Sequence, residues 1–324
     1  MKRQLFLTMA ATVVAIVFAD CNKEKVKIVE PDAESISIQA SIDKMTKVSY
    51  NGDASSFTAG DSIIVYGWTG SALEVPAKLV VDGVINTFDG SSWSAKSPML
   101  WNNNTDSHYF VSVFPVPASV ADLTAAPYKL DESEYTASDL LVAANLRGVK
   151  STDGTVNLTF GHVMAKLNVN LKFRSEWKTV PEIESLTVSA KDSASVNFLT
   201  SGVTAVGPAL SVALPQTAAP AAGFDAGFSG LMVPQEGVKY VVVTIDGQKY
   251  VYESPADIAL NAGRYTTLEL TIGKERIEMN SISIADWTSG QEIKGGEAEL
   301  IVPKQVDPNS GKIPDMGQGW NLDF

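Results

Sequence analysis

The chain has 324 residues, enough for about two ordinary domains, and 45% of them are hydrophobic, so it can bury sizeable cores. Its 25 basic and 37 acidic residues give a net charge of −12, which argues against nucleic-acid binding because that affinity depends on Lys and Arg neutralising phosphates. With one cysteine and two histidines, we expect no internal disulfide, no metal site and no cofactor.

The first 20 residues have the features of a secretory signal peptide. Two basic residues precede an apolar run from Leu5 to Ala19, which is shorter than the roughly 20 apolar residues of a membrane-spanning helix. The only cysteine, Cys21, follows in a stretch that resembles a lipobox except for Asp20 before it. We therefore predict a signal peptide over residues 1–20 and lipidation, as by palmitate, at Cys21. The alternative is a plain signal peptide and a cysteine without a role.

Residues 21–34 are predicted to be a lipidated linker. Two or three acyl chains on Cys21 would give stable anchoring, because each buried methylene contributes roughly 0.8 kcal/mol. Lys23-Glu24 resembles a surface-export signal of bacterial lipoproteins, although a solvated linker explains this pair equally well. We expect the chain to be anchored in the cell outer membrane and exposed at the surface.

The rest of the chain is patterned as β-strands. From Ser35 to Ile42 apolar and polar residues alternate strictly, which predicts a half-buried strand. Its apolar face consists of Ile36, Ile38, Ala40 and Ile42. β-Branched, aromatic or alternating runs predict further strands at residues 62–68, 108–114 and 155–173.

Turn residues predict two hairpins in the second half of the chain. Asp246-Gly247 is a strong tight-turn signal inside residues 238–252. Gly273-Lys274 separates a second pair of strands at residues 264–272 and 275–284. Such local strand pairs are typical of antiparallel β-proteins.

Other segments define the fold class. Residues 136–146 fit a short helix or a strand with its turn, and the Ala-, Gly- and Pro-rich residues 214–230 predict a long loop. Charged residues and a proline interrupt the apolar pattern at residues 173–182, where we expect a domain boundary. Because there are many short strands and no long amphipathic helix, we predict an all-β chain of sandwiches or barrels.

Four segments carry motifs in a recognisable order. They are FTAGDSI at residues 57–63, YFVSVFP at residues 109–115, LTFGHVMAKLNV at residues 158–169 and AGRYTTLEL at residues 262–270. The third is the most specific, since it is similar to a strand of the form F-x-H-x-x-(S/A)-K-(L/V). With these motifs the chain resembles the fimbrillin family, the subunits of type V pili in Bacteroidetes.

The resemblance implies a fold and a function. Fimbrillins consist of two tandem transthyretin-like β-sandwich domains, which we expect at residues 35–175 and 176–324, the second with a terminal tail. The family also implies a structural or adhesive pilus subunit, as a stalk, tip or accessory protein, and not an enzyme. Its partners would be other subunits of the fimbrium.

In this family, assembly proceeds by strand exchange after a protease has removed the first strand of a lipid-anchored precursor. The resemblance therefore implies that Ser35–Ile42 is the removable strand, and burial of its three isoleucines contributes about 1.5–3 kcal/mol each. The candidate cleavage sites are Lys44 and Lys47, because no arginine lies between Arg3 and Arg147.

The donor strand for a neighbouring subunit is expected near the C-terminus. The first candidate has apolar residues that alternate with polar ones, namely Trp320, Leu322 and Phe324. A second candidate consists of Ala298, Leu300 and Val302. Alternatively, the last strand or tail packs on its own domain.

Aromatic residues leave a second function open. Trp68, Trp93 and Trp101, with Asn102–Asn104, could form a sugar-stacking surface, although core packing explains the tryptophans at least as well. The alternative function is therefore a non-polymerising surface lipoprotein that binds glycans or host proteins.

The histidines suggest no catalytic role. His162 stands in an alternating strand, so we expect a structural, packed or hydrogen-bonded side chain. His108 precedes an aromatic strand, where we expect it to be exposed and without a role. No arrangement of serine, histidine and carboxylate has a recognisable catalytic motif, so no catalytic residue is predicted.

Overall fold

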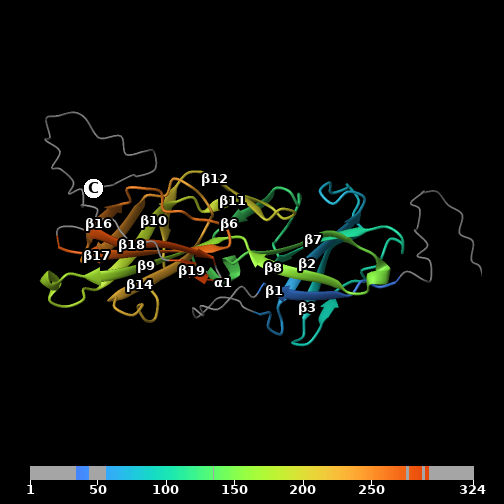
Figure 1. Cartoon of the computed structure of the whole chain (residues 1–324), viewed down its shortest axis with the longest axis horizontal. Coiled ribbons are helices and arrows are strands. Elements are labelled where there is room, and N and C mark those ends of the chain that lie inside the picture. Colours follow the sequence, from blue (N-terminus) through green and yellow to red (C-terminus); the bar gives the residue numbers. More distant parts are fainter. Residues whose placement is uncertain (1–33, 44–55, 134, 275–276, 287–288, 292–324) are drawn as a thin grey trace, which may run out of the picture. The chain divides into compact units, whose positions relative to one another are not determined.

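The computed structural model describes residues 34–43, 56–133, 135–274, 277–286 and 289–291 (Figure 1). Within these residues the chain is all-β, as predicted, and its one α-helix, α1, spans only Tyr135–Ser138. Hydrogen bonding arranges the strands of this part of the chain into four sheets, which pack around two clusters of buried hydrophobic residues.

The first sheet is buried on both faces along its central strands. Across the sheet it consists of β1 (Ile38–Ile42), β8 (Val156–His162), β7 (Leu141–Val149), β5 (His108–Phe114), β2 (Ser62–Thr69), β3 (Val81–Phe88) and β4 (Trp93–Ala95). β1 runs parallel to β8, whereas the other neighbouring pairs are antiparallel. Residues 63–68 of β2 are all buried, so both faces of this strand are covered. This burial on both faces explains why the sequence of β2 is a continuous apolar run.

Three smaller sheets complete the described structure. The four-stranded sheet has the order β13 (Leu210–Ala213), β10 (Ile183–Ala190), β15 (Tyr240–Ile245) and β16 (Gln248–Glu253). The three-stranded sheet has the order β12 (Gly202–Val206), β11 (Ser193–Asn197) and β6 (Ala126–Lys129). The five-stranded sheet has the order β14 (Ala226–Met232), β9 (Ala165–Phe173), β17 (Arg264–Ile272), β18 (Ile277–Asp286) and β19 (Ser289–Gln291).

The chain passes from the first sheet to the five-stranded sheet between β8 and β9. Residues 155–173 therefore form two strands, because Val163 and Met164 separate β8, which pairs with β7, from β9, which pairs with β14 and β17. Both β6 and β9 precede the predicted domain boundary at residues 175 and 176, yet each pairs with strands that follow it. The residues from Glu34 onward form one compact unit, and the boundary stays a prediction.

Buried hydrophobic residues form two cores on opposite faces of the first sheet. Ile63 and Val65 of β2 belong to one core, which we call the N-terminal core, and Ile64 and Tyr66 belong to the other, the main core. Alternate residues of a strand point to opposite faces, so the sheet separates the two cores. The main core continues through the three smaller sheets. The N-terminal core consists of Ile36, Ile38, Ile42, Ile63, Val65, Val81, Met99, Trp101, Phe110, Leu141, Ala143, Val156, Leu158 and Phe160.

Turn chemistry confirms the two predicted hairpins. β15 and β16 are joined by Asp246 and Gly247, whose φ angles are 52° and 73°. A tight turn with two positive φ angles matches the twist of the strands and favours Asp-Gly. β17 and β18 pair on either side of Gly273 and Lys274, also as predicted.

The predicted loop over residues 214–230 is wrong at its end, because Ala226–Met232 forms β14. Packing explains why β14 contains a glycine at position 227. A Cβ atom at Gly227 would lie 2.7 Å from Thr217 Oγ1, so a larger residue there would require the Thr217 side chain to shift. Glycine in a strand weakens the sequence pattern, which is why the segment resembles a loop.

We predict that Gly67→Ala destabilises the first sheet. A Cβ atom at this position of β2 would lie 2.8 Å from Cε1 of the buried Phe110, so the ring must shift. Overpacking of this kind lowers the free energy of unfolding by about 1–3 kcal/mol, measurable by chemical denaturation. Gly161→Ala in β8 is the control, since nothing lies within 4 Å of its added carbon. Equal stability of the two variants would contradict the packing of Gly67.

Candidate assembly site

β1 is an edge strand with one hydrogen-bonded neighbour. Its parallel register with β8 runs from Ile38 opposite Val156 to Ile42 opposite Phe160. The bonds continue at both ends: Val156 N–H donates to Ser37 O and Asp43 N–H donates to Phe160 O, each at 2.8 Å. No strand among the described residues pairs with the opposite edge of β1. Within the part of the chain that the structure describes, a single ladder of backbone bonds therefore joins this strand to the sheet.

The apolar face of β1 lies in the N-terminal core. Ile36, Ile38 and Ile42 are 6%, 9% and 4% exposed, and Ala40 is half-buried. We call the place that β1 fills, beside β8 and over the N-terminal core, the slot. The alternation in the sequence thus correctly indicates which side chains face the interior, while removal of the strand stays a prediction.

The segment after β4 closes one end of the slot. Ile36 N–H donates to Met99 O at 2.8 Å, and Trp101 N–H donates to Glu34 O at 3.1 Å. These bonds flank a bridge between Ser35 and Leu100. Residues 99–101 therefore fix the start of β1, a role that no local pattern in the sequence indicates because the pairing joins distant parts of the chain.

His108 holds this closing segment in place. Its side chain is buried, so the expectation that His108 is exposed is wrong. Nε2 accepts a hydrogen bond from Asn102 N–H at 3.1 Å, which places the proton on Nδ1, 3.1 Å from its acceptor Asp106 O. The ring also contacts Trp101 edge-to-face, with centroids 4.9 Å apart. Burial lowers the pKa of His108, which favours the neutral ring that these bonds require.

An aromatic cluster lies at the other end of the slot. Phe57 contacts Trp93, Phe160 and Phe114 edge-to-face, with centroid distances of 5.0, 5.3 and 5.5 Å. Because Phe160 is opposite Ile42, the cluster marks the end at which the chain leaves β1. Phe57 also opens the FTAGDSI motif, so the aromatic residue of that motif has a packing role beside the slot.

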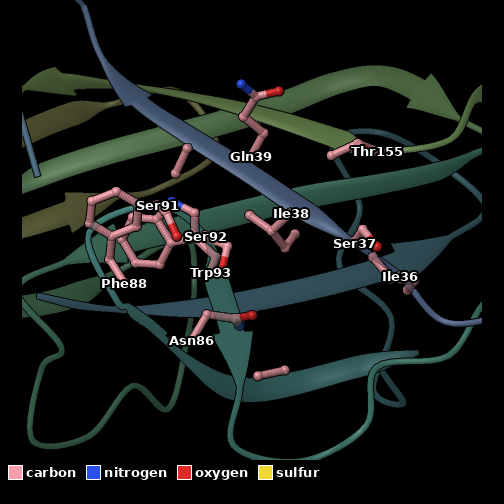
Figure 2. A pocket seen from close by; sticks show the side chains of 12 residues that line it. Ile36, Ser37, Ile38, Gln39, Asn86, Phe88, Ser91, Ser92, Trp93 and Thr155 are labelled. Carbon is pink, nitrogen blue, oxygen red and sulfur yellow. The ribbon is translucent and has the colours of Figure 1, made fainter. Parts of the chain in front are cut away.

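A groove of about 540 Å³ lies between β1 and the hairpin of β3 and β4 (Figure 2). Residues 36–40 line one side of it, and the hairpin contributes Asn86, Phe88, Ser91, Ser92, Trp93 and Ala95. Asp89 shapes the turn of this hairpin, because its carboxylate accepts bonds from the backbone and hydroxyl groups of Ser91 and Ser92. Those bonds lower the pKa of Asp89 and keep it ionised.

The tryptophans do not form a sugar-stacking surface. Trp68 is fully buried in the main core, where its Nε1 donates to Ser71 O at 2.8 Å, and Trp101 is 6% exposed. Trp93 is half-buried and packs against Phe57 and Phe88. Of the two explanations that the sequence left open, core packing therefore accounts for these rings.

His162 joins the end of β8 to the segment before β7. Its Nδ1 lies 2.9 Å from Asp139 Oδ1, and both side chains are largely buried. Next to this pair, Val163 N–H donates to Leu140 O at 3.1 Å. His162 thus has the structural role that we expected, at the point where the chain changes sheets.

Several predicted site residues lie outside the described residues. They are the lipidation site, the cleavage candidates and both donor candidates: Cys21, Lys44, Lys47, Ala298, Leu300, Val302, Trp320, Leu322 and Phe324. In the described part of the chain, no group of histidine, cysteine and carboxylate side chains could hold a metal ion. None of the helices found there is long and apolar enough to cross a membrane. The slot and the groove beside it form the candidate site.

Comparison with known proteins identifies the family. A family model described as fimbrillin-like matches residues 46–287, which is most of the chain. The chain belongs to the fimbrillin-like family. This membership confirms the resemblance seen in the sequence motifs, and the matched region begins just after β1 of the fimbrillin-like chain.

Relatives match this fimbrillin-like chain over most of its length. A candidate fimbrium subunit, Fim1C of Bacteroides uniformis, is 24% identical over 313 residues, covering 92% of this chain and 98% of the relative. The crystal structure of a candidate cell adhesion protein from Bacteroides uniformis has a TM-score of 0.59 and 19% identity, covering 78% of this chain and 98% of that one. One from Bacteroides ovatus has a TM-score of 0.57 and 17% identity, covering 83% and 99%. The structural likeness supports the fold.

We predict that Ile38→Ala loosens β1 of this fimbrillin-like protein. Truncation of a buried isoleucine lowers the free energy of unfolding by about 2–5 kcal/mol, which urea denaturation can measure. Gln39→Ala is the matched control on the same strand, because its side chain is exposed and the change should stay within about 0.5 kcal/mol. If both variants were equally stable, β1 would contribute no buried surface to the N-terminal core.

His108 predicts a pH dependence of stability in this fimbrillin-like protein. Since burial lowers its pKa in the folded chain, the unfolded chain, with a histidine pKa of about 6.5, binds more protons below that pH. The free energy of unfolding should therefore fall as the pH falls below about 6.5, although nearby Asp106 opposes part of this effect. Denaturation over a pH series should show a shallower fall in His108→Gln. Parallel slopes would show that the ring is not held neutral.

Proposed function

We propose that this protein is a structural and adhesive subunit of a cell-surface fimbrium, assembled by proteolysis-triggered strand exchange. The observation that carries the proposal is β1, which has a buried apolar face and one hydrogen-bonded neighbour among the described strands. Family membership and the name of the relative Fim1C support the fimbrial role.

An empty slot would be strongly unfavourable. Burial of Ile36, Ile38 and Ile42 contributes roughly 5–9 kcal/mol in all, which is comparable with the stability of a small domain. Loss of β1 would also leave the backbone groups along the edge of β8 unpaired. A strand with the same alternation satisfies both needs, so a subunit without β1 would bind such a strand from a neighbour.

The peptide connection after β1 explains why cleavage would be the trigger. While residues 44–55 are intact, β1 cannot diffuse away, and a covalently linked strand has an effective concentration of about millimolar. A strand from another subunit competes poorly against that. Hydrolysis of one peptide bond after Lys44 or Lys47 makes β1 a separate peptide, and its loss by dilution becomes possible.

The proposal has three further parts: a lipid anchor, a donor strand and two tandem domains. The precursor is anchored in the outer membrane through Cys21, and the donor strand carries Trp320, Leu322 and Phe324. The two tandem transthyretin-like domains lie at residues 35–175 and 176–324. The N-terminal core supports the proposed first domain, because all members of this core lie between residues 36 and 160.

We predict that the mature subunit begins after Lys44 or Lys47. Mass spectrometry of fimbriae purified from cells should find this N-terminus, and denaturing gels should show a ladder of polymers. Lys44→Gln combined with Lys47→Gln should keep residues 21–44 and remain unassembled. Lys78→Gln combined with Lys249→Gln is the control, since both lysines are exposed on the described surface, and it should assemble normally.

The same measurement distinguishes a fimbrial subunit from the alternative function. A non-polymerising surface lipoprotein would keep an acylated Cys21 and residues 22–44 in its mature form. Polymers whose subunits retain Cys21 and β1 would refute removal of the strand, and an absence of polymers with an uncut chain would favour the alternative.

A further inference from the structure

Beyond Ile36, the outer edge of β1 has no strand partner among the described residues. Ser37 O and Asp43 N–H bond to β8, so the odd-numbered residues of this strand direct their backbone groups toward β8. The even-numbered residues direct theirs to the opposite side, as Ile36 N–H does in its bond to Met99 O. Beyond Ile36, the described residues include no strand that pairs with this edge. With respect to the described part of the chain, the backbone groups of Ile38, Ala40 and Ile42 therefore form a short open edge.

The groove beside β1 gives access to this edge. It lies between β1 and the hairpin of β3 and β4, as Figure 2 shows, and its 540 Å³ leaves room for a few residues of extended chain. The bridge between Ser35 and Leu100 closes it at one end, so the accessible stretch begins near Ile38. Among the described residues that line it, none is charged, so a strand of alternating neutral residues meets no unpaired charge there.

We infer that this groove is the docking site for the incoming strand of a second copy of this chain, which pairs with the outer edge of β1 before β1 leaves β8. This inference rests on the proposed function and adds the order of events. The open edge supplies the hydrogen bonds, as in other cases of strand addition. Residues 292–324, beyond the last described strand, include both donor candidates and could supply that strand.

The order of events has an energetic reason. If β1 left first, its isoleucines, the N-terminal core beneath them and the edge of β8 would all meet water before a replacement arrived. If the new strand pairs first, it can move over the core as β1 moves off it, and less apolar surface is exposed at any one time. Exchange is then a reaction between two molecules, and its rate depends on the concentration of the incoming strand.

The experiment measures the rate of exchange in the full chain. A recognition sequence for a specific protease is introduced within residues 44–55, the chain is cut there, and a fluorescent synthetic peptide of residues 34–43 is added over a concentration series. This peptide has the sequence that the slot already holds, so the test does not depend on which natural strand is the donor. We expect the exchange rate to rise in proportion to the peptide concentration.

Two variants test whether the groove is the route. Ala95→Trp places a ring in the groove, since Ala95 is exposed and lines it, and loss of one or two backbone bonds in docking should slow exchange by about tenfold. Ser94→Trp is the control on the same strand, because Ser94 is exposed and is not among the lining residues. Its rate should match that of the unaltered chain.

Each other outcome has a distinct meaning. A rate that does not depend on peptide concentration would overturn the inference, because β1 would then leave first or the chain's own C-terminal segment would occupy the groove. A concentration-dependent rate that Ala95→Trp leaves unchanged would overturn the groove as the route. No exchange at all after complete cutting would refute strand exchange itself, and the proposed function would fail together with this inference.

Discussion

The parallel pairing of β1 with β8 is the interaction on which the candidate site depends. It combines one ladder of backbone bonds with the burial of three isoleucines, so within the described structure β1 is held along one edge. A central strand would be held on both edges and could not be exchanged without opening the sheet. An exposed edge strand would be released with little cost and would need no replacement. β1 lies between these cases, and this intermediate attachment makes both retention and replacement physically reasonable.

The two cores explain how the rest of the subunit could tolerate an empty slot. β1 contributes side chains to the N-terminal core, whereas the main core lies on the opposite face of the first sheet and contains no residue before Ile64. The other six strands of that sheet remain paired with one another without β1. The damage from its loss is therefore confined to one face, and the main core can preserve the shape of the slot for a new strand.

Much of the fold follows from alternation and turn chemistry in the sequence. The residues of β1 and β5 were predicted closely, because a strict two-residue period and a β-branched, aromatic run are strong local signals. The division of residues 155–173 was missed although it had a signal. Buried hydrophobic positions are even-numbered from Val156 to Phe160 and odd-numbered from Ala165 to Leu171. A change of phase inside an alternating run therefore indicates a change of sheet.

The candidate site was only partly predictable. The inward-facing residues of β1 could be read from its period, but the partners that form the slot come from distant segments. His108 illustrates the limit, since its burial depends on the loop of residues 101–107 folding over it. The groove depends equally on the approach of β1, which ends at Ile42, to the hairpin of β3 and β4, which begins at Val81. No local pattern carries this information.

The direction of β1 has a consequence for the form of the assembled fibre. A strand that takes over the bonds to β8 in the same register must run from its N-terminus to its C-terminus in the direction of β8. Every junction would then have the same polarity, with a donor on one subunit and an acceptor on the next. Such head-to-tail contacts do not pair a surface with itself, so they lead to an open, directional filament with two unlike ends.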